Sequence, residues 1–307
     1  MLHYSVLLKE SIDNLNIKDG DTIVDCTLGY GGHSSEILKL IPNGHLYAFD
    51  QDVDAINYSR KRLSKISDNF TIINSNFVNI KSKLYEEGIN KVDGILYDLG
   101  VSSPQLDEGD RGFSFHQDAR LDMRMDKNNS LSAYEVVNNY SYNELVSIFK
   151  RYGEEKYASS IARGIEKIRK EKPIETTLEL VEVIKNNVPE KYKREKHPAR
   201  KVFQAIRIEV NDELNVCEKS LRDSLDLLTV GGRLCVITFH SLEDKLVKKL
   251  FKEVSSVPND LMKLPVIPEK YQPKFKLIKM INPSDEEVNE NNRSRSAHLR
   301  IIERIKD

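Results

Sequence analysis

The chain has 307 residues, of which 39% are hydrophobic and 31% charged, and its formal net charge is −1 at pH 7. This composition is typical of a globular protein and excludes a disordered chain. No apolar run reaches the roughly 20 residues that a membrane span requires. Residues 1–9 lack the basic start and long apolar core of a secretion signal, so we expect a cytoplasmic protein with no membrane partner.

The three cysteines, Cys26, Cys217 and Cys235, are widely separated and form no CxxC pair. Their spacing argues against a disulfide framework and against a structural zinc site. We expect three buried thiols and no bound metal.

The first hundred residues alternate short β-branched or aromatic runs with helical patterns. This alternation predicts a parallel sheet covered by helices. The predicted strands are 22–26, 45–50, 70–74 and 92–98, and the predicted helices between them are 34–41, 52–66 and 77–87.

The middle of the chain has a different pattern. Residues 131–188 contain no convincing strand, and the helical segments 142–152, 157–170 and 177–187 indicate an inserted helical module. The alternating pattern then resumes, with helices at 202–228 and 242–254 and strands at 233–239, 275–281 and 298–305. The last two strands have no helix between them, which predicts an antiparallel hairpin at one edge of the sheet.

A glycine-rich turn, Gly29-Tyr-Gly-Gly-His33, follows the first predicted strand, and Asp50 ends the second. Ligands of open parallel sheets bind at the carboxyl ends of the strands, where such a carboxylate suits the two ribose hydroxyls of a nucleotide-like cofactor. Position 34 is Ser34, so the GxGxxG fingerprint of pyrophosphate binding is incomplete.

Two further residues bear on the identity of this cofactor. Asp25 stands beside the turn, where a carboxylate suits a ligand that carries ammonium and sulfonium charges; its alternative role is a turn or helix cap. Phe77 follows the third strand and either stacks on an adenine ring or packs in the core.

The segment Asp98-Leu-Gly-Val-Ser-Ser-Pro-Gln105 ends the fourth strand and resembles the acceptor loop of amino methyltransferases. With further motifs the chain resembles the bacterial 16S ribosomal RNA (cytosine-N4) methyltransferase family, from His3 to Arg300. These motifs are Asp25–Ser34, Arg111–Phe115, Leu121–Asp126, Tyr152–Glu155, Phe203–Ile208, Phe239–Asp244 and Arg293–Arg300.

The resemblance implies a seven-stranded, Rossmann-like class I methyltransferase core with an inserted all-helical domain. S-adenosylmethionine would be the methyl donor and a cytidine of the ribosomal decoding centre the acceptor. The core would comprise 1–105 and 206–307, and the insertion, 106–205, would recognise RNA. The donor contacts carried over are Gly31, Gly32, His33, Asp50, Phe77, Asp98 and Gln105.

For catalysis, our hypothesis is that Asp98 and the Ser102-Ser103-Pro104 backbone accept hydrogen bonds from the cytosine amine and orient it. The proton would leave afterwards to Asp98 or to water. Orientation can contribute roughly 7–11 kcal/mol, more than a single general base supplies.

Several basic groups are candidates for RNA contact. Residues 191–201 carry six Lys or Arg against one acid, and Arg111 and Arg124 lie in the loop after the acceptor segment. The competing interpretation for all of them is a solvated, salt-bridged surface. His240 follows the fifth strand and either binds RNA or caps the next helix. The basic candidates within 191–201 are Lys193, Arg194 and Lys196.

Other functions share parts of this pattern. A DNA amino methyltransferase would use the same acceptor chemistry, a nicotinamide oxidoreductase the same fold, and a non-catalytic RNA-binding factor the same basic surface. The sequence also leaves open whether the chain forms a homodimer.

Overall fold

The computed structural model describes residues 5–100, 111–195, 197–261 and 267–307. The chain divides into two compact units, Met1–Gly100 with Leu214–Asp307, and Val101–Glu213. The second unit therefore begins before the predicted boundary at 106 and ends after the predicted one at 205. It extends this far because helix α11 (Arg200–Asn211) packs against α6 (Ala133–Asn139) and α7 (Tyr142–Arg151).

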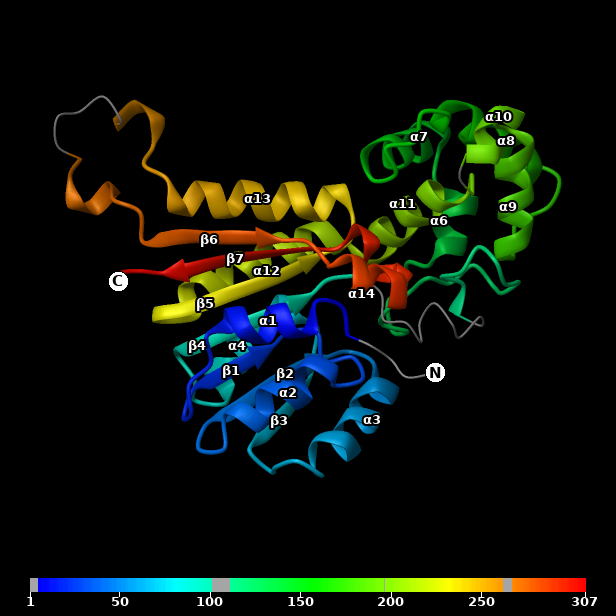
Figure 1. Ribbon diagram of the computed structural model, residues 1–307. Helices are drawn as coiled ribbons and strands as arrows, with labels where there is room; N and C mark the ends of the chain where they lie inside the picture. Colours follow the sequence, from blue (N-terminus) through cyan, green and yellow to red (C-terminus); the bar gives the residue numbers. More distant parts are fainter. Residues whose placement is uncertain (1–4, 101–110, 196, 262–266) are drawn as a thin grey trace. The chain divides into compact units, whose positions relative to one another are not determined.

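The first unit is built on one seven-stranded sheet in the order β3-β2-β1-β4-β5-β7-β6 (Figure 1). The strands are β1 Thr22–Asp25, β2 His45–Asp50, β3 Phe70–Asn74, β4 Val92–Asp98, β5 Leu228–Thr238, β6 Phe275–Ile281 and β7 His298–Arg304. Neighbours among β1 to β5 run parallel, and β7 is antiparallel to both β5 and β6. The predicted Rossmann-like core and its antiparallel edge hairpin are confirmed.

Helices cover both faces of the sheet. One face packs against α1 (Leu8–Leu15), α2 (Gly32–Leu40) and α3 (Val53–Leu63). The other packs against α4 (Ile80–Glu86), α12 (Glu213–Leu227) and α13 (Ser241–Ser255). The unit also contains α14 (Asp285–Glu290) and the short 3-10 helices η1 Phe77–Asn79, η3 Asn259–Leu261, η4 Glu269–Tyr271 and η5 Asn292–Ser296.

Strand alternation puts the three acidic strand ends on one side of the sheet. Side chains of successive strand residues point to opposite faces. Those of Val24, Tyr47, Phe49, Ile95 and Tyr97 join the core beneath α12 and α13. Their sequence neighbours Asp25, Asp50 and Asp98 therefore belong to the face covered by α1, α2 and α3.

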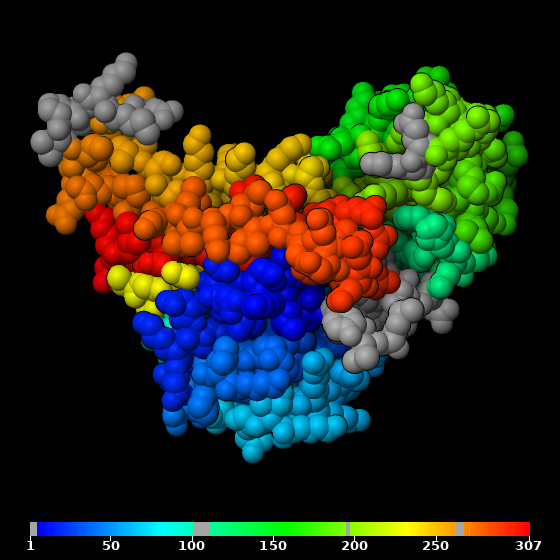
Figure 2. Space-filling model, viewed as in Figure 1, coloured from blue at the N-terminus to red at the C-terminus, as the bar shows by residue number. Residues whose placement is uncertain are grey.

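The segment that contains α14 and η5 lies beside the N-terminal residues, as Figure 2 shows in orange-red and blue. The backbone N–H of Leu7 donates a 2.7 Å hydrogen bond to Glu287 Oε1 of α14. This contact joins the start of α1 to a segment 280 residues further along the chain.

The second unit is helical, as predicted for 131–188. Its other helices are α8 Ala158–Arg169, α9 Thr177–Asn186 and α10 Glu190–Glu195. The single helix predicted for 202–228 is wrong, because α11 and α12 are separated at Asp212, whose φ is 49°. No helix in the described part of the chain has the length and apolar character of a membrane span.

Candidate functional site

The glycine turn between β1 and α2 requires its glycines. Gly29 and Gly31 have φ values of 48° and 72°, a left-handed conformation that side chains disfavour. A Cβ on Gly32 would overlap the side chain of Ser5. The turn therefore packs closely against Ser5 and Ser59, and its approach to a ligand stays a prediction.

Asp50 is held at the end of β2 by two backbone groups. Gly29 N–H donates to its Oδ2 at 2.8 Å and Asp52 N–H donates to its Oδ1 at 2.9 Å. Burial raises the pKa of Asp50 to about 6, so the carboxylate is mostly ionised at neutral pH. A carboxylate has about four acceptor positions, and those that remain on Asp50 suit neighbouring ribose hydroxyls.

Asp25 is 1% exposed and accepts hydrogen bonds from Thr27 N–H at 3.0 Å and Ser34 Oγ at 2.7 Å. The alternative interpretation of Asp25, a cap for the turn and the first residues of α2, therefore describes its contacts. Thr27 Oγ1 also donates to its Oδ1 at 3.4 Å, and a donor contact at the remaining acceptor position of the carboxylate stays a prediction.

Asp98 ends β4 next to His33 of α2. Its backbone N–H donates to Thr27 Oγ1 at 2.7 Å, and its Oδ2 lies 3.8 Å from His33 Nδ1. The other oxygen, Oδ1, is buried and has no hydrogen-bond partner among the described residues. Burial, followed by the charges of Asp25, Glu243 and Glu287, raises the pKa of Asp98 to about 8. A buried acceptor without a partner is suited to a ligand's N–H group.

Phe77 lies in η1 and contacts Tyr97 edge-on, with the ring centroids 5.4 Å apart. Its ring packs against the core beneath α12 and is partly buried. These contacts fit the core interpretation of Phe77, and its stacking on adenine stays a prediction.

Comparisons with family models and with curated proteins place the chain in a known family. The model of the MraW methylase family matches residues 1–305. The chain belongs to the MraW methylase family. A ribosomal RNA small subunit methyltransferase H from Exiguobacterium sibiricum is 56% identical over 308 residues, 99% of each chain. An rRNA methylase structure from Streptococcus thermophilus is 13% identical, covers 100% of this chain and 99% of its own, and has a TM-score of 0.46.

The predicted methyltransferase activity and its methyl donor, S-adenosylmethionine, are confirmed at the level of the family. The residues present fit this donor. Asp50 retains acceptor positions for ribose hydroxyls, and the buried carboxylate of Asp25 beside the turn suits a positively charged ligand; both contacts stay predictions.

Five predicted residues lie outside the described residues. They are Ser102, Ser103, Pro104 and Gln105 of the acceptor loop, and Lys196 of the basic segment.

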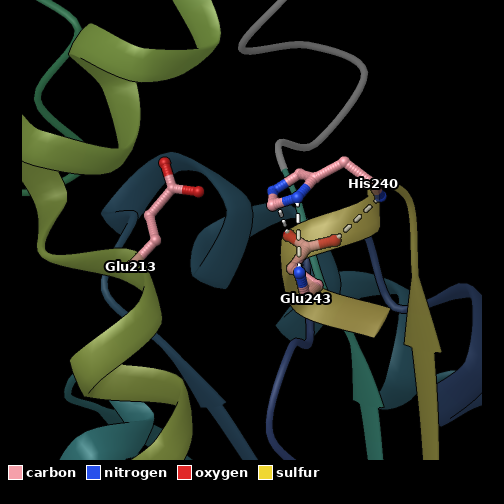
Figure 3. Close-up of side chains that lie close together, drawn as sticks. All are labelled: Glu213, His240 and Glu243. Atoms are coloured by element: carbon pink, nitrogen blue, oxygen red, sulfur yellow. Dashed lines mark hydrogen bonds and ion pairs between the residues drawn. The ribbon is translucent and has the colours of Figure 1, made fainter. Parts of the chain in front are cut away.

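His240 caps helix α13 (Figure 3). Its Nδ1 accepts a hydrogen bond from Glu243 N–H at 3.4 Å, and its Nε2 lies 3.0 Å from Glu243 Oε1. Glu243 Oε2 in turn accepts from Phe239 N–H at 2.8 Å. The capping interpretation of His240 thus holds. Glu243 stands three residues after His240, and this spacing, which is that of a capping box, is the sequence signal for its role. Glu213, also drawn in Figure 3, belongs to the second unit and pairs with Arg207 at 2.7 Å.

In the second unit, both predicted arginines form contacts within their own loop. Arg111 donates to the backbone oxygens of Arg124 and Met125 at 2.9 and 3.0 Å. Arg124 makes two hydrogen bonds of 2.8 Å to the carboxylate of Asp122. These contacts match the salt-bridged interpretation, and RNA binding by either arginine stays a prediction.

The basic segment 191–201 is anchored by a contact that the sequence did not indicate. Tyr192 of α10 donates a 2.6 Å hydrogen bond to Glu155, which is 2% exposed. Lys193 pairs with Glu190 at 2.5 Å, and Arg194 is exposed. The Tyr152–Glu155 motif therefore fixes the helix that carries these two cations.

Proposed function

We propose that this chain transfers a methyl group from S-adenosylmethionine to the exocyclic N4 amine of a cytidine in the decoding centre of 16S ribosomal RNA. The name of the 56% identical relative, a ribosomal RNA small subunit methyltransferase, supports the substrate class. The observation that carries the choice of an amine is the buried Asp98 Oδ1, an acceptor with no partner among the described residues. An amine N–H would satisfy it.

The chemistry depends mainly on orientation. The N4 lone pair of cytosine is delocalised into the ring, whereas the bound donor supplies an activated methyl group. By accepting one amine hydrogen, Asp98 Oδ1 fixes the direction of the remaining lone pair. Such positioning contributes roughly 7–11 kcal/mol, against about 3–5 kcal/mol for one general acid or base. The backbone of Ser102, Ser103 and Pro104 would accept the second hydrogen.

The target base must leave its stack to be methylated, at a price of a few kcal/mol unless the RNA is already irregular. We assign the holding of flanking RNA to the second unit, where Lys193 and Arg194 extend from an anchored helix. An enzyme that acts on the ribosome would work in the cytoplasm, which is the location we propose.

The experiment supplies labelled donor with assembled small ribosomal subunits, naked 16S RNA and DNA, and maps the modified nucleotide by mass spectrometry. Methylation at N4 of one decoding-centre cytidine is the expected result. Labelling of DNA, or RNA binding without methyl transfer, would contradict the proposal.

Asp98→Asn tests the role of the carboxyl group. We expect single-turnover transfer at saturating donor to fall at least 100-fold. The amide of the variant can present its NH₂ group, which cannot accept a hydrogen bond, to the substrate amine, and unlike the Asp98 carboxyl group it cannot take up a proton. Donor affinity is measured in parallel. An unchanged rate would remove Asp98 from the acceptor site.

A further inference from the structure

The side chain of His33 points at Asp98, although the sequence assigned it only to the donor. We infer that His33 is the proton partner of Asp98: Asp98 is a carboxylic acid whose Oδ2 proton is directed at His33 Nδ1, which leaves Oδ1 to accept the substrate amine. This inference rests on the proposed function, and it makes His33 a positioning residue.

The tautomer of His33 follows from its contacts. His33 is 5% exposed, and its Nε2 lies 3.2 Å from the backbone oxygen of Val6, which can only accept a hydrogen bond. Burial lowers the pKa of the imidazole, which is therefore neutral and carries its one proton on Nε2. Nδ1 then has a free lone pair, 3.8 Å from Asp98 Oδ2. Catalytic hydrogen bonds are often this long before substrate binds.

The groups around the pair favour an extra proton. Asp25 of β1, Glu243 of α13 and Glu287 of α14 all act electrostatically on Asp98, and Asp25 also acts on His33. No Lys or Arg is among the groups that shift the pKa of either residue in the described part of the chain. A neutral Asp98 avoids a further negative charge in this acidic surrounding.

The pair can also remove the proton of the methylated amine. Once methylated, the N4 nitrogen is cationic and its N–H bond breaks, with the proton passing to Asp98 Oδ1. The O–H bond at Oδ2 breaks at the same time, and its proton binds His33 Nδ1. Asp98 remains a neutral acid with its proton now on Oδ1, and one positive charge has moved from the base to the imidazole. The charge of Asp25 stabilises this imidazolium until its proton leaves to water and the Asp98 proton returns to Oδ2.

The pair is tested first without RNA, by ¹⁵N NMR of the histidine rings in the full-length chain between pH 5.5 and 9.5. We expect His33 to be protonated at Nε2 only, with its Nδ1 signal shifting around pH 8 as Asp98 ionises. In Asp98→Asn this inflection should disappear. A proton on Nδ1, or the same titration in the variant, would overturn the inference.

The second test uses His33→Gln, whose amide can still donate to the Val6 oxygen but has no basic nitrogen at the Nδ1 position. Donor affinity is measured in parallel, and transfer is followed at a donor concentration that saturates each enzyme, because His33 is also a predicted donor contact. Single-turnover transfer should fall about 10- to 100-fold, with a changed pH–rate profile. The matched control is His45→Gln. His45 begins β2, at the end of the strand away from Asp50, and its Nε2 lies 2.9 Å from Thr71 Oγ1.

The outcomes separate the two proposals. A His33→Gln enzyme with the wild-type rate and pH profile would overturn the proton pairing alone. If the wild-type chain methylates no ribosomal cytidine, the proposed function fails, and the NMR titration still decides whether His33 and Asp98 share a proton.

Discussion

Arg300 of β7 donates two hydrogen bonds to the carboxylate of Asp244 in α13, at 2.6 and 2.9 Å. The two side chains are 16% and 21% exposed. They join the Phe239–Asp244 motif to the Arg293–Arg300 motif, which are separated by almost 50 residues in the sequence. The pair thus holds the edge hairpin against the helix that His240 and Glu243 cap.

Arg300→Lys should lower the free energy of unfolding by about 1 to 3 kcal/mol at pH 7, because an ammonium cannot form the paired bonds of a guanidinium. Urea unfolding measures this loss. Arg222→Lys is the control, since Arg222 is 45% exposed and bridges exposed Glu218 and Glu253. Its loss should stay below about 1 kcal/mol. Equal losses in both variants would contradict a special role for the Arg300 pair.

Donor affinity should depend on the ionisation of Asp50. The raised pKa of Asp50, about 6, leaves a carboxylate above that pH and a protonated, poorer acceptor below it. We expect the affinity for S-adenosylmethionine to be about tenfold weaker at pH 5 than at pH 7. Calorimetric titrations across this range measure the effect. Asp50→Asn should bind weakly with no such dependence; a pH-dependent variant would point to another group.

The core fold was largely predictable, because strand alternation and strand ends are local properties of the sequence. Helix α1 was missed for a physical reason. Its N-cap, Leu7, has a φ of 51° and no capping side chain, so the usual start signal is absent. The cap comes instead from Glu287, which no local pattern reveals. The break at Asp212 was missed because apolar spacing continues across it.

The site was predicted less completely than the fold. The spacing correctly located Asp25, Asp50 and Asp98 at strand ends, but it could not show which carboxylate oxygens local groups already occupy. Asp25 accepts from Ser34, whereas Asp98 Oδ1 has no described partner. His33 illustrates the same limit, since its approach to Asp98 depends on how α2 packs on the sheet.

Asp98→Asn should stabilise the protein at alkaline pH. The pKa of Asp98 is about 8 in the folded chain and about 3.9 when unfolded. The folded state therefore binds the proton more tightly, and its stability falls as pH rises between these values. The variant lacks this dependence, so its advantage should grow from pH 5 to pH 9, by at most about 1.4 kcal/mol per unit. Thermal unfolding of the donor-free protein measures it, and a constant difference would contradict the raised pKa.

The last prediction concerns RNA binding by α10. Lys193→Glu with Arg194→Glu should weaken binding of 16S RNA and reduce its salt dependence, because each lost phosphate contact removes about 0.7 to 0.9 from the slope of log K against log salt. The fold should survive, since the exposed pair of Lys193 with Glu190 contributes only about 0.3 to 0.5 kcal/mol.

Filter binding at several salt concentrations measures the slope, and calorimetry measures donor affinity, which should not change. Lys39→Glu with Lys83→Glu is the matched control. These lysines pair with Glu36 and Glu86 at the same i,i+3 spacing, but they lie on α2 and α4 of the first unit. The control makes the same change in net charge. If both double variants lose RNA affinity equally, net charge alone drives binding, and α10 is no specific RNA contact.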